Sequence, residues 1–300
     1  MSNHIAFIGV GNMGNPMANQ LVKAGQNVKV FDVSSDVIEI AKQSGLNVIN
    51  SMEELLEGAT TVISMLPEGK HVRSLYLGDN GILKSIPKDC LIIDCSTIDI
   101  ETSLALGNEA KKIGINMIDA PVTGGVMGAR IGKLNFLVGG TKESVAIAKP
   151  LFNIMGQKSV FCGAAGNGQS AKICNNMILG VTMIATCEAF SLADNLGLDR
   201  QAMYDVVSTS SGSSWSMNTY CPAKGIGPQS PSDNDYVPGF ASDLMLKDLR
   251  LAQQAAHEVQ AVTPMGKAAT DIYESFVEKD NGSGLDFSAI LPWIKNINKS

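Results

Sequence analysis

The sequence predicts an α/β domain with a mostly parallel, doubly wound sheet, followed by an all-helical domain that a long helix joins to the first. Three observations predict this order. A short apolar run at residues 4–8 leads into spaced glycines and a helix-like segment, strand-like and helix-like segments then alternate to about residue 163, and the strand signal fades beyond it. We expect one domain over residues 1–164 and the second over residues 165–300.

Short apolar runs mark the strands expected in the first domain, at residues 4–8, 28–31, 60–65, 91–95, 116–120, 134–138 and 159–162. Segments of helical length lie between them, at residues 15–24, 35–44, 52–57, 70–76, 99–112 and 142–155. This alternation is typical of βαβ units with helices on both faces of a sheet, in which ligands bind at the carboxyl ends of the strands.

The second domain is expected to begin after a glycine-rich junction at residues 163–168. Residues 169–196 contain no proline and only Gly180 as a weak point, which predicts a helix roughly 40 Å long. Further helices are expected at residues 199–208, 242–258 and 263–279, and residues 225–238, rich in Pro, Ser and Gly, predict a loop.

Composition excludes several classes of protein. The 300 residues carry a net charge of −6 with no basic run, so nothing favours nucleic-acid binding. The six cysteines form no C-x-x-C pair and the three histidines show no ligand spacing, which predicts free thiols and no metal. The apolar run at residues 177–187 is shorter than the about 20 residues of a membrane span. With no signal peptide visible, we expect a cytoplasmic protein, or a mitochondrial-matrix protein if a transit peptide was removed.

Gly9, Gly11 and Gly14 follow the first expected strand and open the first expected helix. In such a turn the first glycine permits the bend, the second lets the backbone approach a pyrophosphate, and the third allows close packing of helix on strand. Asp32 ends the second strand, eighteen residues after Gly14, where a carboxylate binds a ribose 2′-hydroxyl and repels a 2′-phosphate. The pattern favours NAD over NADP; the competing interpretation is a glycine turn that binds no nucleotide.

Lys172 lies near the start of the long helix, and Asn176, four residues later, shares its face. An enzyme that oxidises an alcohol with a nicotinamide cofactor needs a base for the hydroxyl proton. Burial and a nearby helix N-terminus both favour the neutral, proton-accepting form of a lysine. We interpret Lys172 as that base, assisted by Asn176; the alternative is a surface lysine on a capped helix.

Polar motifs also follow other expected strands. At residues 119–125 (DAPVTGG), the glycines and the Thr123 hydroxyl form a candidate cradle for a carboxylate, or else an ordinary turn. The hydroxyls of residues 94–97 (DCST) are candidates to reach a substrate or nicotinamide. Residues 65–67 (MLP) are expected to pack against the cofactor or in the core.

Phe240, Lys247 and Asp248 lie at the start of a helix expected in the second domain. One interpretation is that this helix closes over the site. The other is that Lys247 and Asp248 belong to a solvated helix face.

Taken together, these motifs resemble the β-hydroxyacid dehydrogenase family, essentially from end to end. The matching stretches, in order, are residues 7–17, 65–67, 94–97, 119–125, 168–176 and 247–249. Residues 64–72, 210–215, 220–222 and 284–288 point to the hydroxyisobutyrate branch of that family.

The resemblance implies a Rossmann domain, an all-helical second domain and a homodimer or homotetramer. It implies Lys172 and Asn176 as catalytic residues. The substrate-binding residues that it implies are Thr123, Gly124, Gly125, Phe240, Asp248 and Trp215. The cofactor-binding residues are Gly9, Gly11, Asn12, Met13, Gly14, Asp32, Leu66, Pro67, His71, Thr97 and Lys247.

The implied reaction is the NAD-dependent oxidation of a small 3-hydroxy acid, (S)-3-hydroxyisobutyrate, to methylmalonate semialdehyde, as in valine catabolism. Two residues depart from the family pattern: Thr123 stands where a Ser is common, and Ser214 where close relatives often carry Asn. The alternatives are a related 3-hydroxyacid dehydrogenase or a reductase of tartronate, succinate or glyoxylate-type semialdehydes, an imine reductase of the same architecture, and a non-catalytic scaffold.

Overall fold

The computed structural model describes residues 3–297, and the chain divides into two compact units after Lys172. The division falls inside a helix, α8 (Asn167–Leu196), whose first turns pack on the first unit. The domain boundary at residues 164 and 165 stays a prediction.

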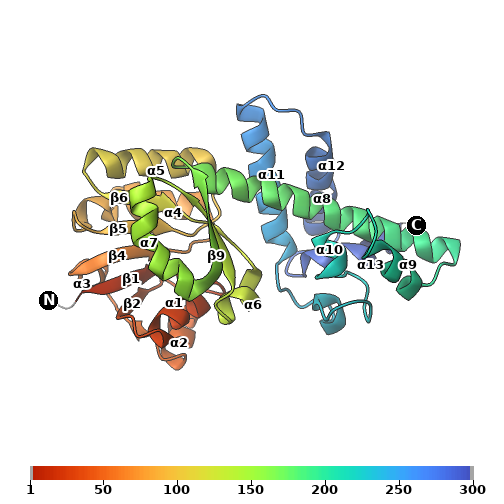
Figure 1. Cartoon of the computed structure of the whole chain (residues 1–300), viewed down its shortest axis with the longest axis horizontal. Helices are drawn as coiled ribbons and strands as arrows, with labels where there is room; N and C mark the ends of the chain where they lie inside the picture. Colours follow the sequence, from red (N-terminus) through yellow and green to blue (C-terminus); the bar gives the residue numbers. More distant parts are fainter. Residues whose placement is uncertain (1–2, 298–300) are drawn as a thin grey trace. The chain divides into compact units, whose positions relative to one another are not determined.

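One nine-stranded sheet organises the first unit, with the order β3-β2-β1-β4-β5-β6-β8-β7 and β9 beside β8. Figure 1 labels β1, β2, β4, β5, β6 and β9 of this sheet. The strands are β1 (His4–Ile8), β2 (Val28–Phe31), β3 (Asn47–Val48), β4 (Ala59–Ser64), β5 (Leu91–Asp94), β6 (Asn116–Asp119), β7 (Val122–Thr123), β8 (Leu134–Gly139) and β9 (Gly156–Gly163). The six strands from β1 to β6 are parallel, and the strand order reverses between β1 and β4. Such a reversal is where ligands bind in doubly wound sheets.

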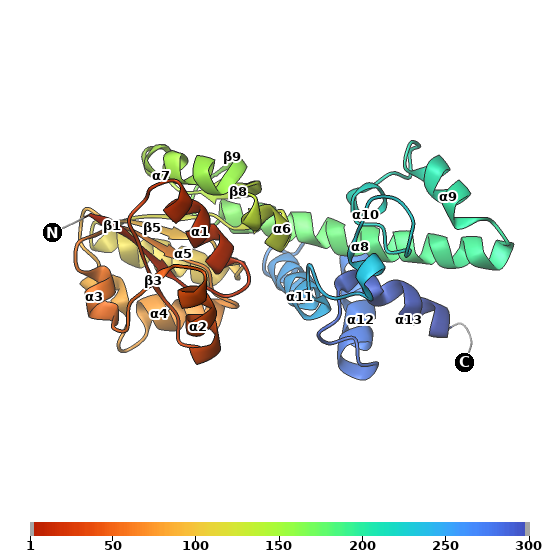
Figure 2. The same cartoon turned by 90° about the horizontal axis from the view of Figure 1, so that it is seen from below.

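Helices cover both faces of this sheet. They are α1 (Gly14–Lys23), α2 (Ser35–Gln43), α3 (Met52–Leu56), α4 (Gly69–Leu77), α5 (Ile100–Lys112), α6 (Gly125–Arg130) and α7 (Lys142–Met155). Figure 2 shows α1 and α7 on one face and α3 and α4 on the other. The alternation along β1 explains this arrangement, because Phe7 packs into one apolar core and Ala6 and Ile8 into the other.

Local sequence explains where several helices begin. The side chain of Asp99 accepts a hydrogen bond from the backbone N–H of Thr102 (2.7 Å) at the start of α5. Ser34 and Thr141 cap α2 and α7 in the same way. A side-chain oxygen at this position satisfies a backbone N–H that the helix leaves unpaired.

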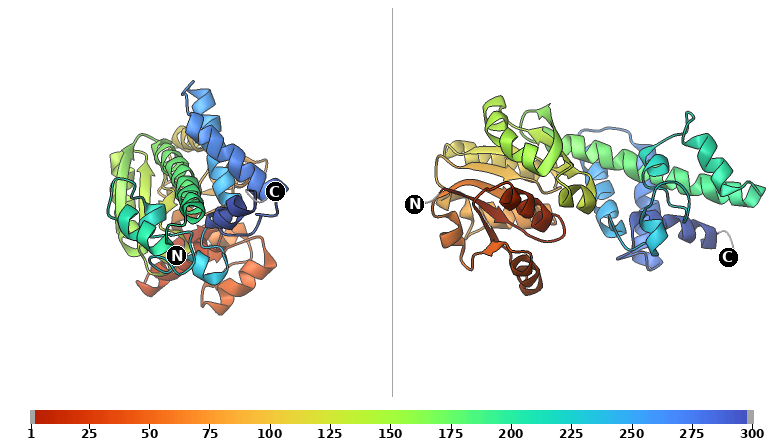
Figure 3. Two further views of the ribbon diagram at one scale, coloured as in Figure 1. Left: turned by 90° about the vertical axis from the view of Figure 1, so that its right-hand side faces the viewer. Right: turned by 60° about the horizontal axis from the view of Figure 1, so that its bottom comes forward.

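The second unit is built from helices around the distal part of α8 (Figure 3). They are α9 (Arg200–Val207), α10 (Trp215–Asn218), α11 (Ser242–Glu258), α12 (Pro264–Glu274) and α13 (Ile290–Ile297). Gly180 allows α8 to approach α11, because a Cβ atom there would lie 3.0 Å from the Leu249 side chain. The core gathers apolar side chains from these helices, including Met183, Phe190, Met245 and Tyr273.

The predicted fold class is therefore confirmed, with differences in detail. The sequence did not indicate β3, β7, α6, α10 or α13. The strand β8 runs antiparallel to β6 and β7. The helix expected at residues 263–279 is α12 followed by a π-helical turn, Ser275–Lys279, and the loop at residues 225–238 contains a 3-10 turn, Pro231–Asn234.

Among the described residues one helix, α8, has the length and apolar composition of a membrane span. Half of its most apolar window is buried inside the protein. The core helix of a soluble protein meets the same criterion, so the finding is weak evidence for a membrane.

Candidate active site

The glycine loop after β1 has the geometry that a dinucleotide needs. Gly9 has a φ of +88°, and a Cβ atom there would lie 2.4 Å from the carbonyl oxygen of Met65. A Cβ atom on Gly14 would lie 1.9 Å from the carbonyl oxygen of Gly9, so α1 packs directly on the turn. Gly11 is different, because a Cβ atom there would meet nothing within 4 Å. The loop therefore leaves open space at the position where the backbone would face a pyrophosphate.

Asp32 is tied to this loop by its own carboxylate. Oδ2 accepts a hydrogen bond from the backbone N–H of Val10 (2.9 Å), and Oδ1 accepts one from Ser34 (3.0 Å). These bonds fix a negative charge beside the glycine loop, and the next residue, Val33, is 91% exposed rather than a cation. The loop and this acid fit a dinucleotide whose ribose has a free 2′-hydroxyl.

The loops after β4 and β5 are joined to each other. The backbone N–H of Leu66 donates to the Ser96 hydroxyl (2.8 Å), which itself donates to Oδ1 of Asp94 (2.7 Å). Ser96 is fully buried and its hydroxyl is engaged by these two contacts, so the expectation that a hydroxyl of this motif reaches a ligand is wrong for Ser96. The other hydroxyl of this motif belongs to Thr97, whose side chain is half-buried.

The other cofactor-binding residues implied by the resemblance lie at the same carboxyl edge of the sheet. Asn12 is exposed and Met13 half-buried in the glycine loop. Pro67 is exposed after β4, and His71 is exposed on the first turn of α4.

The loop predicted to hold a carboxylate lies between β7 and α6. Gly124 and Gly125 have φ values of +117° and +60°, which a glycine adopts without strain. The chain thereby turns from Thr123 directly into α6, whose first N–H groups are free of helical partners. The Thr123 hydroxyl accepts a hydrogen bond from Nδ2 of Asn135 (3.3 Å) on β8.

Lys172 lies in the second turn of α8, within the same unit as the glycine loop and the cradle. Its exposed fraction is 8%, which excludes the interpretation as a solvated surface lysine. Asn176 follows one turn later and is also buried. The two side chains therefore share a face of α8.

Two further candidates, Lys247 and Asp248, meet Asn176 in the second unit. Nδ2 of Asn176 donates to Oδ2 of Asp248 (2.5 Å), and Nζ of Lys247 lies 3.2 Å from Oδ1 of Asp248. The latter contact is an ion pair without hydrogen-bond geometry. Asp248 is 3% exposed, so the interpretation as a solvated helix face is wrong for this residue.

The two aromatic candidates of the second unit, Trp215 and Phe240, belong to one cluster of four rings. Trp215, half exposed, stacks on Tyr220 (centroids 4.9 Å apart), and Phe240 meets the edge of Phe287 (5.5 Å). Tyr220 also contacts Phe287 (5.3 Å), so the four rings are continuous.

Sequence reasoning missed a buried polar network at the strand ends. The Tyr76 hydroxyl donates to Ser64 (3.0 Å), and Ser64 donates to Oδ1 of Asp94 (2.7 Å). Burial is the main cause that raises the pKa of Asp94 to about 6. Burial likewise raises the pKa of Asp119, although backbone N–H groups of Gly166 and Gln169 bind its carboxylate. The signal available in the sequence was that Asp94 and Asp119 each end a strand.

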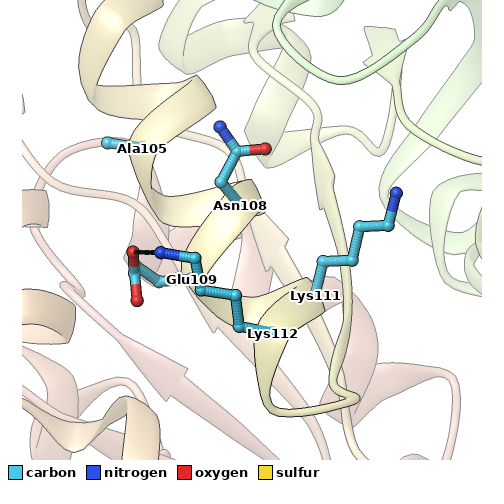
Figure 4. A pocket seen from close by; sticks show the side chains of 5 residues that line it. All are labelled: Ala105, Asn108, Glu109, Lys111 and Lys112. Carbon is cyan, nitrogen blue, oxygen red and sulfur yellow. Dashed lines mark hydrogen bonds and ion pairs between the residues drawn. The ribbon is translucent and has the colours of Figure 1, made fainter.

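A separate pocket on α5 contains none of the candidate residues. Figure 4 shows its lining by Ala105, Asn108, Glu109, Lys111 and Lys112, with an ion pair between Glu109 and Lys112 (2.6 Å). Most of these side chains are exposed, so the pocket is a helix surface. Within residues 3–297, no group of three or more His, Cys, Asp or Glu is placed to hold a metal ion.

Comparison with known proteins assigns the chain to a family. Residues 4–163 match the model of the NAD binding domain of 6-phosphogluconate dehydrogenase, and residues 166–294 match the NAD-binding model of NADP-dependent 3-hydroxyisobutyrate dehydrogenase. The chain is 46% identical over 287 residues to 3-hydroxyisobutyrate dehydrogenase of Pseudomonas aeruginosa, covering 95% of this chain and 96% of that protein. It is 41% identical over 286 residues to the NAD-dependent L-serine dehydrogenase of the same organism, covering 95% and 96%.

A solved structure agrees with these relatives. The 3-hydroxyisobutyrate dehydrogenase of Mycobacterium tuberculosis, described with L-serine, superimposes with a TM-score of 0.91 at 42% identity, covering 98% of this chain and all of that one. The chain therefore belongs to the 3-hydroxyisobutyrate dehydrogenase family, and it is a hydroxyacid dehydrogenase that uses a nicotinamide dinucleotide.

Proposed function

We propose that the protein oxidises (S)-3-hydroxyisobutyrate to methylmalonate semialdehyde with NAD⁺, a reaction of valine breakdown. The observation that carries this proposal is the burial of Lys172. This lysine lies in the unit that also holds the glycine loop and the loop of residues 123–125. A lysine is a costly side chain to bury, and proton transfer to a substrate hydroxyl is a function that requires it there. Relatives of 46% and 42% identity that carry this activity in their names support the choice of substrate.

In this proposal each group has one task. The backbone N–H groups and the hydroxyl of residues 123–125 bind the substrate carboxylate. Lys172 accepts the hydroxyl proton at Nζ, and Asn176, held by Asp248, orients the lysine or the substrate hydroxyl. NAD⁺, when bound, supplies the acceptor for the hydride from the alcohol carbon.

Phe240, Asp248 and Trp215 are proposed to line the substrate, and Lys247 and Thr97 to contact the cofactor. Leu66, Pro67 and His71 are proposed as further cofactor contacts. The support for these roles is that the residues match the corresponding positions of the family.

The preference for NAD over NADP rests on Asp32. Its carboxylate is fixed by Val10 and Ser34, so it cannot easily turn away from a 2′-phosphate. Charge repulsion at this position is the property that separates the two cofactors.

L-serine is the second candidate substrate. It shares the carboxylate and the 3-hydroxyl of hydroxyisobutyrate, with an ammonium group in place of the methyl group. A 41% identical relative is named an NAD-dependent L-serine dehydrogenase, and the superimposed structure is described with L-serine. A homodimer or homotetramer, in the cytoplasm or the mitochondrial matrix, completes the proposal.

Initial rates of NADH or NADPH formation test the choice of substrate and cofactor. We would compare both enantiomers of 3-hydroxyisobutyrate with L-serine and 3-hydroxypropionate, each with NAD⁺ and with NADP⁺. The proposal predicts the highest kcat/KM for (S)-3-hydroxyisobutyrate with NAD⁺. A higher value for L-serine would keep the family and replace the substrate.

A further inference from the structure

The start of α8 is bound to the sheet by an acid that has no task in the proposed chemistry. Asp119, at the end of β6, accepts hydrogen bonds from the backbone N–H groups of Gly166 (2.7 Å) and Gln169 (3.0 Å). Asp119 is 2% exposed and Gln169 is fully buried. The carboxylate thus anchors the backbone of the first turn of the helix that carries Lys172.

The side chain of Gln169 makes a second connection, to the loop after β5. Nε2 donates to the carbonyl oxygen of Ser96 (2.7 Å), and Oε1 accepts from the backbone N–H of Ile98 (3.1 Å). These two groups flank Thr97. The Gln169 amide therefore binds the loop on both sides of Thr97, a proposed cofactor contact. Its NH₂ group and its carbonyl oxygen are both used in these bonds.

The backbone at the start of α8 packs so closely on the sheet that a side chain at either of two glycines would clash. A Cβ atom on Gly168 would lie 2.4 Å from the carbonyl oxygen of Leu137 and 2.6 Å from Oδ2 of Asp119. One on Gly139 would lie 2.5 Å from Oδ1 of Asp119. The first turn of α8 is thus held by close backbone packing, and Gln169 adds the link to residues 96–98.

We infer that Gln169 is a positioning residue, which fixes Lys172 relative to the Thr97 loop. Lys172 follows Gln169 by three residues on α8, so the two project from the same side of the helix. The inference rests on the proposed role of Lys172 as the base. Gln169 acts through Lys172 and the Thr97 loop rather than by touching substrate.

The variant Gln169→Glu makes the inference testable by pH. A protonated Glu keeps both bonds, because its O–H donates to the Ser96 carbonyl while its other oxygen accepts from Ile98. The ionised Glu places a negative oxygen against that carbonyl and breaks the link. Three ionisable groups are connected to this position: Asp119 on β6 binds the backbone N–H of Gln169, the charge of Asp119 acts on Asp94 on β5, and Lys172 lies three residues further along α8. The wild-type protein carries all three.

The quantity to compare is the kcat of the variant divided by the kcat of wild type. Each kcat is calculated per NADH-binding site. At pH 9 we expect the ratio to be about 0.01–0.1, since misplacement of a catalytic group by about 1 Å costs up to roughly 10²-fold in rate. As the pH falls to 6 the ratio should rise at least about fivefold, because burial favours the protonated acid. A structural role alone would change the number of NADH-binding sites and leave kcat per site unchanged.

Two further variants complete the test. Gln169→Leu removes both bonds without adding an acid, so its ratio should be low and independent of pH, with NADH affinity within about twofold of wild type. Gln201→Glu makes the same substitution on the exposed surface of α9 and should match wild type at every pH.

A pH-independent ratio for Gln169→Glu, or normal kcat for Gln169→Leu, would overturn the inference. If Gln169→Leu does not fold, the titration of Gln169→Glu alone decides. Lys172→Ala separates the two proposals. If it is active, the proposed function fails; if it is inactive while the Gln169 variants match wild type, only the positioning role fails.

Discussion

Asp94→Asn should change how the stability of the protein depends on pH. The Asp94 carboxylate is fully buried at the end of β5, and its Oδ2 has no hydrogen-bond partner among the described residues. Burial is the largest cause that raises its pKa from 3.8 to about 6; hydrogen bonds from Ser96 and Ser64 oppose the rise, and the charge of Asp119 adds to it.

The direction and the size of the change in stability with pH follow from this rise in the pKa of Asp94. The folded protein holds the proton more tightly than the unfolded chain, so Asp94 favours folding at low pH and loses that contribution as the pH rises through about 6. A rise from 3.8 to about 6 corresponds to about 3 kcal/mol, and most of it, about 2 kcal/mol, is lost between pH 4 and pH 8. An asparagine does not titrate, so the variant avoids this loss. The asparagine NH₂ group would take the place of Oδ2, which has no hydrogen-bond partner among the described residues. The resulting loss of stability is the same at every pH.

Urea unfolding at intervals from pH 4 to pH 8 measures the effect. The free energy of unfolding of Asp94→Asn minus that of wild type should rise by about 2 kcal/mol over this range. Asp36→Asn, an exposed acid on α2, is the matched control and should show a flat difference. A difference for Asp94→Asn that stays constant within about 0.5 kcal/mol would show that the pKa of Asp94 is not raised in the folded protein.

The other predictions concern the cofactor and the cradle. Asp32→Asn should lower the ratio of kcat/KM for NAD⁺ over NADP⁺ at least about tenfold, since it removes the charge that repels a 2′-phosphate; an unchanged ratio in initial-rate assays would show that Asp32 is not the selector. Gly14→Ala should weaken NADH binding at least about tenfold in a fluorescence titration, because its Cβ would lie 1.9 Å from the Gly9 carbonyl oxygen; wild-type affinity would contradict the close packing. Gly124→Ala forces an L residue to a φ of +117°, a strain of about 1–3 kcal/mol, and should raise the KM for the hydroxy acid several-fold with NADH affinity unchanged; an unaltered KM would remove this loop from the carboxylate site.

Much of the first unit was predictable because its signals are local. The strand, the glycine spacing and Asp32 all lie within 29 residues, from His4 to Asp32, and the structure joins them through the bond from Val10 to Asp32. The Lys172 and Asn176 pair was equally visible, because four residues along a helix define a face. Buried strands and capped helices followed from periodicity and from residues such as Asp99.

Features that depend on distant contacts were not predictable. The helix α6 spans six residues, two of them glycines, and it forms where the positive φ of Gly124 turns the chain out of β7. The direction of β8 depends on pairing with β6 and β7, which no local pattern encodes. The sequence could not show that the Ser96 hydroxyl is turned away from a ligand. Its direction is set by its hydrogen bond to Asp94, which only the folded loop reveals. Gln169 meets Ser96 across 73 residues of sequence, so its role is visible only in the fold.

We propose that Lys172, a buried lysine at the start of α8, is the base of this hydroxyacid dehydrogenase. The most direct measurement is kcat for (S)-3-hydroxyisobutyrate oxidation by Lys172→Ala, with NADH affinity measured on the same preparation. We predict a loss of at least about 10²–10⁴-fold in kcat, with NADH affinity largely intact. Turnover within a few-fold of wild type would contradict the account, because another group would then have to accept the proton.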